Sequence, residues 1–130
     1  MIYLDTSAAA KLVQHERESQ ALAVWLAARI GRPLVSSALI YPELIRAVTR
    51  HRPGLADRAI ALSQRIMTVP IAADIVASSA TVGNPGLRTL DAIHLATAVA
   101  IGAELEAFVT YDKRLAAAAA EIGLTVAAPA

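Results

Sequence analysis

The chain has 130 residues, the length of one ordinary domain, and it contains no cysteine, which excludes disulfide frameworks and cysteine-based zinc sites. Hydrophobic residues make up 56% of the sequence, but no apolar run is long enough to span a membrane and no secretion signal opens the chain, so we expect a cytoplasmic protein. Twelve basic and eleven acidic residues give a formal net charge of +1, a balance that by itself argues against a nucleic-acid partner.

Short β-like runs alternate with longer helical runs along the whole chain. In chain order we expect a strand at 1–4, helices at 7–14 and 16–30, a strand at 34–36, helices at 38–50 and 55–66, a short strand at 67–71, helices at 72–82 and 89–101, a strand at 107–111, a helix at 113–122 and a last strand at 124–127. This alternation predicts an α/β fold with a mostly parallel sheet and helices on both faces. Ligands of such sheets bind beyond the carboxyl ends of the strands.

Two of the expected helices carry clear apolar patterns. The second helix has a stripe of Leu22, Leu26 and Ile30 with Trp25 beside it, which predicts a face turned toward the core. The helix at 89–101 is apolar almost all round, which predicts a buried helix.

Two acidic residues stand where expected strands end. Asp5 follows the first strand, and Asp112 follows the strand at 107–111. Aspartate is also a preferred helix N-cap, because its carboxylate accepts hydrogen bonds from the free N–H groups of the first turn. The sequence leaves a capping role and a functional role open for both residues.

Two further acids lie in the first turns of helices. Asp91 begins the apolar helix, where an unpaired carboxylate is costly, so it needs Arg88, the helix N-terminus or a metal ion as a partner. Glu43 follows Pro42, and its ordinary interpretation is a solvated residue paired with Arg46.

Considered together, the four acids favour a metal site. In a parallel sheet flanked by helices all four side chains can meet at one edge, where they repel one another unless a cation is present. Mg²⁺ prefers oxygen ligands and is held by a few carboxylates together with substrate phosphates. If four of the eleven acids gather there, twelve basic groups face only seven acidic ones over the rest of the surface. Neighbouring hydroxyls suited to orienting the ligands belong to Thr6, Ser7 and Thr110.

Three segments of the sequence carry a resemblance to a known family. They are MIYLDTSA at 1–8, LDAIHLATA at 90–98 and VTYDKRL at 109–115, with Glu43 between the first two. In these segments the chain resembles the PIN-domain family and, more narrowly, the VapC-type toxins of bacterial toxin–antitoxin pairs. The resemblance implies a single PIN domain over residues 1–130, built as a three-layer α/β/α sandwich with a five-stranded parallel sheet.

The same resemblance implies an activity and partners. The activity is endoribonuclease hydrolysis of RNA that depends on Mg²⁺, with Mn²⁺ as a substitute. The family's acidic positions correspond to Asp5, Glu43, Asp91 and Asp112 in this chain, as catalytic residues and metal ligands. The family also implies a homodimer and a cognate antitoxin protein that blocks the site.

Basic residues near the acids are candidates for contacts with the RNA backbone. Arg46 and Arg50 follow Glu43 on one expected helix, and Lys113 and Arg114 follow Asp112. Phosphate contacts of this kind make binding sensitive to salt. The alternative is an ordinary solvated helix face.

His94 lies three residues after Asp91, on the same helical face. It is a candidate proton shuttle or metal ligand, and the alternative is a packed structural histidine held by hydrogen bonds. The sequence does not decide between them.

Two other classes of protein compete with the ribonuclease hypothesis. A phosphotransfer receiver domain needs a mid-chain phosphoacceptor aspartate, yet the only acids between Glu43 and Asp91 are Asp57 and Asp74, both in helical patterns. A PIN-like binding module without catalytic activity has the same fold and is separated from an enzyme only by experiment.

Overall fold

The computed structural model describes residues 1–130. Its strands are β1 (Ile2–Leu4), β2 (Leu34–Ser37), β3 (Met67–Val69), β4 (Ala107–Val109) and β5 (Val126–Ala127). Its α-helices are α1 (Thr6–Val13), α2 (Ser19–Ala27), α3 (Ile40–His51), α4 (Ala56–Arg65), α5 (Ala73–Ser79), α6 (Thr89–Ile101) and α7 (Lys113–Glu121), with short 3₁₀ turns at Pro53–Leu55 and Gly102–Glu104. Every element expected from the sequence is present, with shifted ends.

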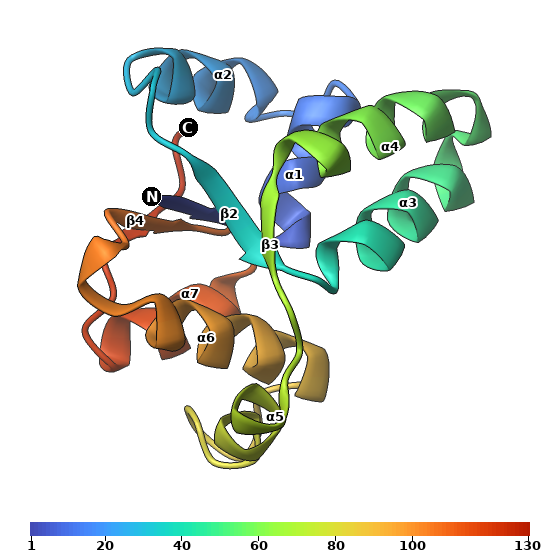
Figure 1. The fold of residues 1–130 in the computed structure, drawn as a ribbon. Coiled ribbons are helices and arrows are strands. Elements are labelled where there is room, and N and C mark those ends of the chain that lie inside the picture. Colours follow the sequence, from blue (N-terminus) through green and yellow to red (C-terminus); the bar gives the residue numbers. More distant parts are fainter.

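The five strands form one parallel sheet in the order β3-β2-β1-β4-β5. The chain runs outward from β1 to β2 and β3, and then crosses to β4 on the other side of β1 (Figure 1). The connection after β1 thus runs to one side of the sheet and the connection after β4 runs to the other. Ligands of open α/β sheets bind beyond the carboxyl ends of two such neighbouring strands. Asp5 and Thr110 directly follow these two strands.

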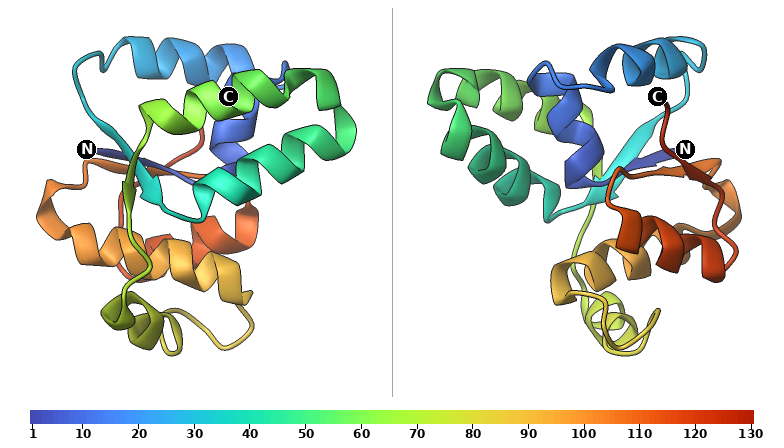
Figure 2. Two further views of the ribbon diagram at one scale, coloured as in Figure 1. Left: turned by 45° about the vertical axis from the view of Figure 1, so that its right-hand side comes forward. Right: turned by 180° about the vertical axis from the view of Figure 1, so that it is seen from behind.

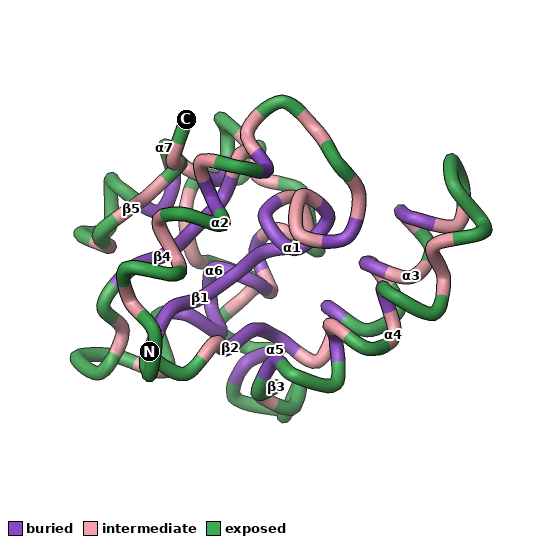
Figure 3. Tube along the Cα trace, turned by 90° about the horizontal axis from the view of Figure 1, so that it is seen from above, coloured by how far each residue is buried: buried purple, intermediate pink, exposed green.

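Helices cover both faces of the sheet and complete a three-layer sandwich. Helices α1 to α4 lie on one side and α5 to α7 on the other, as Figures 1 and 2 show. Alternation along β1 assigns its side chains to the two faces. Ile2 and Leu4 pack with α1 to α4, whereas Tyr3 packs on the opposite face with Phe108 and Leu95. Figure 3 shows the buried residues concentrated in β1 and in the helix sides turned toward the sheet.

Two packing predictions from the sequence are wrong in part. Ile30 is 91% exposed, because α2 ends at Ala27 and the helical spacing no longer applies beyond it. Helix α6 buries one side against the sheet but exposes Leu90 and Val99 on another, because the chain has no second layer to cover that side. Trp25 is half-buried against the core, beside Leu22, which is fully buried.

The carboxyl end of α6 is explained by its local sequence. Gly102 stops the helix with a φ of +72°, a conformation that glycine adopts without steric cost. No helix of the chain has the length and apolar character required to cross a membrane.

Candidate active site

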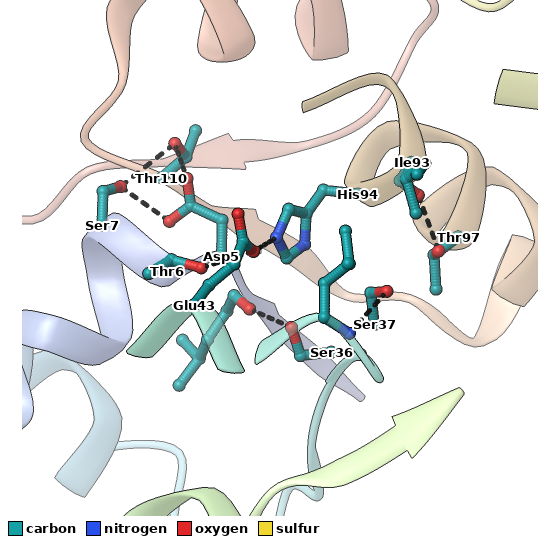
Figure 4. Close-up of polar contacts among 12 residues, drawn as sticks. Asp5, Thr6, Ser7, Ser36, Ser37, Glu43, Ile93, His94, Thr97 and Thr110 are labelled. Carbon is teal, nitrogen blue, oxygen red and sulfur yellow. Dashed lines mark hydrogen bonds and ion pairs between the residues drawn. The ribbon is translucent and has the colours of Figure 1, made fainter. Parts of the chain in front are cut away.

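Asp5 lies at the carboxyl end of β1, beside the end of the paired strand β4, and is almost fully buried. Its Oδ1 atom accepts hydrogen bonds from the Ser7 hydroxyl at 2.7 Å and from the Ala8 backbone N–H at 2.9 Å. Its Oδ2 atom accepts from the Thr110 hydroxyl at 2.5 Å. Figure 4 shows the contacts from Ser7 and Thr110 converging on the carboxylate. Asp5 is thus the N-cap of α1, as the alternative interpretation proposed, and it also belongs to a polar cluster.

Burial raises the pKa of the Asp5 carboxyl above its ordinary value. The hydrogen bonds from Thr110, Ser7 and Ala8 oppose this rise, because they stabilise the charged form, but they do not cancel it. Burial therefore destabilises the charged form of Asp5, and a nearby positive charge would stabilise it.

A second acid, Asp112, is linked to Asp5 through Thr110. The Thr110 hydroxyl accepts a hydrogen bond from the Asp112 backbone N–H at 3.1 Å. The Oδ1 atom of Asp112 caps α7 by accepting from the N–H groups of Arg114 and Leu115 at 2.9 and 3.0 Å. Its capping role is therefore confirmed, while its Oδ2 atom has no hydrogen-bond partner within the protein.

Glu43, in the first turn of α3, points toward the same cluster (Figure 4). Its Oε1 atom accepts a hydrogen bond from the Thr6 hydroxyl at 2.8 Å and lies 2.6 Å from Nε2 of His94. The expected pairing with Arg46 is wrong, because His94 and Thr6 take its place. The Oε2 atom has no partner within the protein.

Asp91, in the first turn of α6, forms no hydrogen bond or ion pair through its side chain, with Arg88 or with any other residue. Its pKa is raised first by burial and then by the negative charge of Asp112. The carboxylates of Asp5 and Glu43 raise it further, and the His94 imidazole partly offsets them. The structure therefore places the other three predicted acids close enough to Asp91 to raise its pKa.

The four carboxylates are not gathered closely enough to coordinate one metal ion as they stand. No group of three His, Asp or Glu side chains has the compact arrangement of a finished metal site. Both oxygens of Asp5 and one oxygen each of Glu43 and Asp112 accept hydrogen bonds within the protein, whereas the oxygens of Asp91 accept none. The chemistry of the donor set nevertheless fits Mg²⁺, since its ligand atoms are carboxylate oxygens and several of them lack partners.

His94 is fully buried and makes two hydrogen bonds, so the interpretation as a packed histidine matches its surroundings. Sequence reasoning missed its contact with Glu43, and it also missed Tyr3, whose hydroxyl lies 2.7 Å from Nδ1 of His94. The available signal was the alternation along β1, which turns Tyr3 toward the α6 face while Ile2 and Leu4 face the other way.

The predicted RNA-binding residues are exposed and flank the acids. Arg46 and Arg50 follow Glu43 along α3, and Lys113 and Arg114 open α7 directly after Asp112. None of the four forms an ion pair within the protein, so their charges are available to a partner.

Comparisons with known proteins agree with this architecture. The family model described as PIN domain matches residues 2–121. Ribonuclease VapC47 of Mycobacterium tuberculosis is 42% identical over 132 residues, covering 99% of this chain and 97% of the relative. Ribonuclease VapC35 of the same species is 46% identical over 131 residues, with 99% and 97% covered.

A solved structure supports the fold independently. The crystal structure of VapC20 from M. tuberculosis, described as a toxin that cleaves the sarcin–ricin loop, superposes with a TM-score of 0.73. It covers 99% of this chain and 100% of its own at 20% identity. At that identity the likeness concerns the fold alone.

Proposed function

This chain belongs to the PIN-domain family and, within it, to the VapC-type toxin ribonucleases. We propose that it is a metal-dependent endoribonuclease whose active site contains the carboxylates of Asp5, Glu43, Asp91 and Asp112. The observation that carries the proposal is Asp91. A carboxylate with no partner, whose pKa is raised first by burial and then by three neighbouring carboxylates, costs stability unless a cation offsets the charge.

The residues that would hold Mg²⁺ or Mn²⁺ are Asp5, Glu43, Asp91 and Asp112. Asp91 would offer both of its oxygens, while Glu43 and Asp112 would each offer the oxygen that the protein leaves free. When bound, such an ion lowers the pKa of water and neutralises charge that develops on a phosphate.

The chain's own residues would prepare the site for that chemistry. Ser7 and Thr110 fix the Asp5 carboxylate, and Thr6 and His94 fix Glu43, so the acids are oriented before substrate arrives. We propose that a water molecule attacks the phosphorus in line and that the bond to the 3′-oxygen breaks. The products are then a 5′-phosphate and a 3′-hydroxyl.

We further propose which macromolecules bind at and around the carboxylate site. Arg46, Arg50, Lys113 and Arg114 would contact the RNA backbone on either side of the scissile phosphate, since they are exposed and unpaired. As in the family to which the chain belongs, we propose a homodimer and a cognate antitoxin protein that covers the site.

The test is inducible expression in a bacterial host, comparing wild type with Asp5→Asn and Asp91→Asn and sequencing total RNA for new 5′ ends. Asparagine is a suitable replacement for Asp5 because it caps a helix as well as aspartate does. Asp57→Asn, which changes an exposed acid on α4, is the matched control. We expect discrete cuts with wild type and with the control, and none with the two site variants.

The outcomes separate the alternatives. The cut positions would identify the target among transfer, ribosomal and messenger RNA. If soluble wild type binds Mn²⁺ but leaves every RNA intact, the binding-module alternative replaces the ribonuclease. If the products end in a 2′,3′-cyclic phosphate, the attack by water is wrong.

A further inference from the structure

We propose that His94 and Tyr3 are positioning residues that hold Glu43 with one carboxylate oxygen fixed and the other turned toward the proposed metal site. The inference rests on the proposed function, in which Glu43 is a metal ligand. It assigns a role to two buried polar residues on different elements, β1 and α6, that the fold alone does not explain.

A continuous line of hydrogen bonds runs from β2 through β1 and α6 to α3. The Ser37 backbone N–H donates to the Tyr3 hydroxyl oxygen at 3.1 Å. The same hydroxyl lies 2.7 Å from Nδ1 of His94, and Nε2 of His94 lies 2.6 Å from Oε1 of Glu43. Tyr3 and His94 are fully buried, and the His94 ring meets the Tyr3 ring edge to face.

The donors and acceptors along this line fix where the imidazole proton lies. A phenol hydroxyl has one hydrogen, and burial raises the pKa of Tyr3, so that hydrogen is retained. Its oxygen accepts from the Ser37 N–H, and its hydrogen is available to Nδ1 of His94. Because a carboxylate only accepts hydrogen bonds, Nε2 carries a proton and donates to Glu43.

The consequence for Glu43 is a defined carboxylate orientation. Both the Thr6 hydroxyl and the His94 Nε2–H donate to Oε1, so the second oxygen is free to meet a cation. A glutamate has three rotatable side-chain bonds, and this one is 22% exposed, so without these donors it has several orientations available. Partners that orient a metal ligand typically matter ten- to a hundredfold for metal affinity.

Thr97, on the same helix, shows how a buried polar group is satisfied when it has no such role. Its hydroxyl donates at 2.7 Å to the Ile93 carbonyl one turn earlier, as Figure 4 shows. His94 instead reaches across to a residue 51 positions away. The His94 contact therefore joins α6 to α3, which the Thr97 bond within one helix does not do.

The first experiment locates the ring proton by nitrogen NMR of histidine-labelled protein without added metal. We expect Nε2 of His94 to carry a proton in wild type, and we expect the Tyr3→Phe variant to show the other tautomer as well. An unprotonated Nε2 in wild type would overturn the inference.

The second experiment measures Mn²⁺ affinity by calorimetry without RNA. We expect His94→Leu and Tyr3→Phe to weaken binding about tenfold or more, and His94→Gln to recover part of the loss because its amide also donates. Thr97→Val removes a buried hydroxyl from the same helix and is the control, expected to bind as wild type does. Thermal melts identify any variant that does not fold, and Tyr3→Phe then replaces His94→Leu.

A double-mutant cycle separates positioning from general packing. In a Glu43→Gln background, changes at His94 or Tyr3 should produce no further loss of Mn²⁺ affinity, because they act through Glu43. Equal losses in both backgrounds, or a matching loss in Thr97→Val, would overturn the inference. If the cycle holds but wild type cuts no RNA, the ribonuclease proposal fails and the positioning role stands. If wild type binds no Mn²⁺, both fail.

Discussion

The Thr110 hydroxyl donates a 2.5 Å hydrogen bond to Oδ2 of Asp5, although the two residues lie 105 positions apart. This bond joins the carboxyl ends of β1 and β4 at the point where the chain connections diverge. Because Thr110 also accepts from the Asp112 N–H, one hydroxyl links the residues that cap α1 and α7. The Oγ1 atom of Thr110 therefore contributes both to the stability of the fold and to the geometry of the site.

Replacing Thr110 by valine should impair both properties. The variant leaves the Asp112 N–H without its partner and removes a donor from the buried Asp5 carboxylate, which should cost about 1–3 kcal/mol of unfolding free energy. RNA cleavage should fall about tenfold or more, because Asp5 loses an orienting contact. Denaturant unfolding and cleavage of a reporter RNA measure the two effects.

The matched control for this change is Thr68→Val, which removes an exposed hydroxyl from the edge strand β3. It should change neither quantity. Normal cleavage by Thr110→Val would show that the Asp5 contact serves the fold only.

The pH dependence of stability without metal should show the strain among the carboxylates. Burial raises the pKa values of Asp5 and Asp91 above the ordinary 3.8 in the folded protein, so well below pH 3.8 both the folded and the unfolded chain hold these protons. As the pH rises, the unfolded chain loses them first. The folded state then binds more protons, and the unfolding free energy falls until the pH passes the folded-state pKa values.

Asp91→Asn isolates the part of this effect that belongs to Asp91. In EDTA, the variant should melt a few degrees above wild type at neutral pH, and the difference should disappear as the pH falls below 3.8. Melting curves across this range provide the measurement. A variant that melts below wild type at neutral pH would mean that Asp91 has a structural partner.

Adding metal should shrink the stability advantage of Asp91→Asn. A ligand at about ten times its Kd stabilises the protein that binds it by roughly 1.4 kcal/mol, so Mn²⁺ should raise the melting temperature of wild type. Asp91→Asn should gain much less, and the two proteins should converge. An equal gain in both would place the Mn²⁺ site away from Asp91.

Charge removal at Arg46 and Arg114 should affect binding of RNA and leave the chemical step intact. Arg46→Gln and Arg114→Gln should each raise KM with little change in kcat, and should flatten the dependence of affinity on salt by about 0.7 per lost phosphate contact. Arg32→Gln is the control, because Arg32 precedes β2 at the opposite end of the sheet and pairs with Glu106. A fall in kcat with KM unchanged would assign these residues to another role.

Much of the fold was predictable because its signals are local. The alternation of apolar runs with helical spacing located every strand and helix, and the parallel sheet followed from that order. The errors lie where local spacing stops being sufficient. Ile30 falls beyond the end of α2, and Leu90 and Val99 face a side of α6 that no other element of the chain covers.

By itself, the sequence determined the identity of the four acids, their places at strand ends and first helical turns, and their hydroxyl neighbours. Only the tertiary structure decided which donor serves which carboxylate. Glu43 pairs with Thr6 and His94 rather than with nearby Arg46, and Tyr3 reaches His94 from the face of β1 that packs against α6. The reason is physical: a strand or helix sets the direction of a side chain locally, but a hydrogen-bond partner is set by the packing of elements that are distant in the sequence.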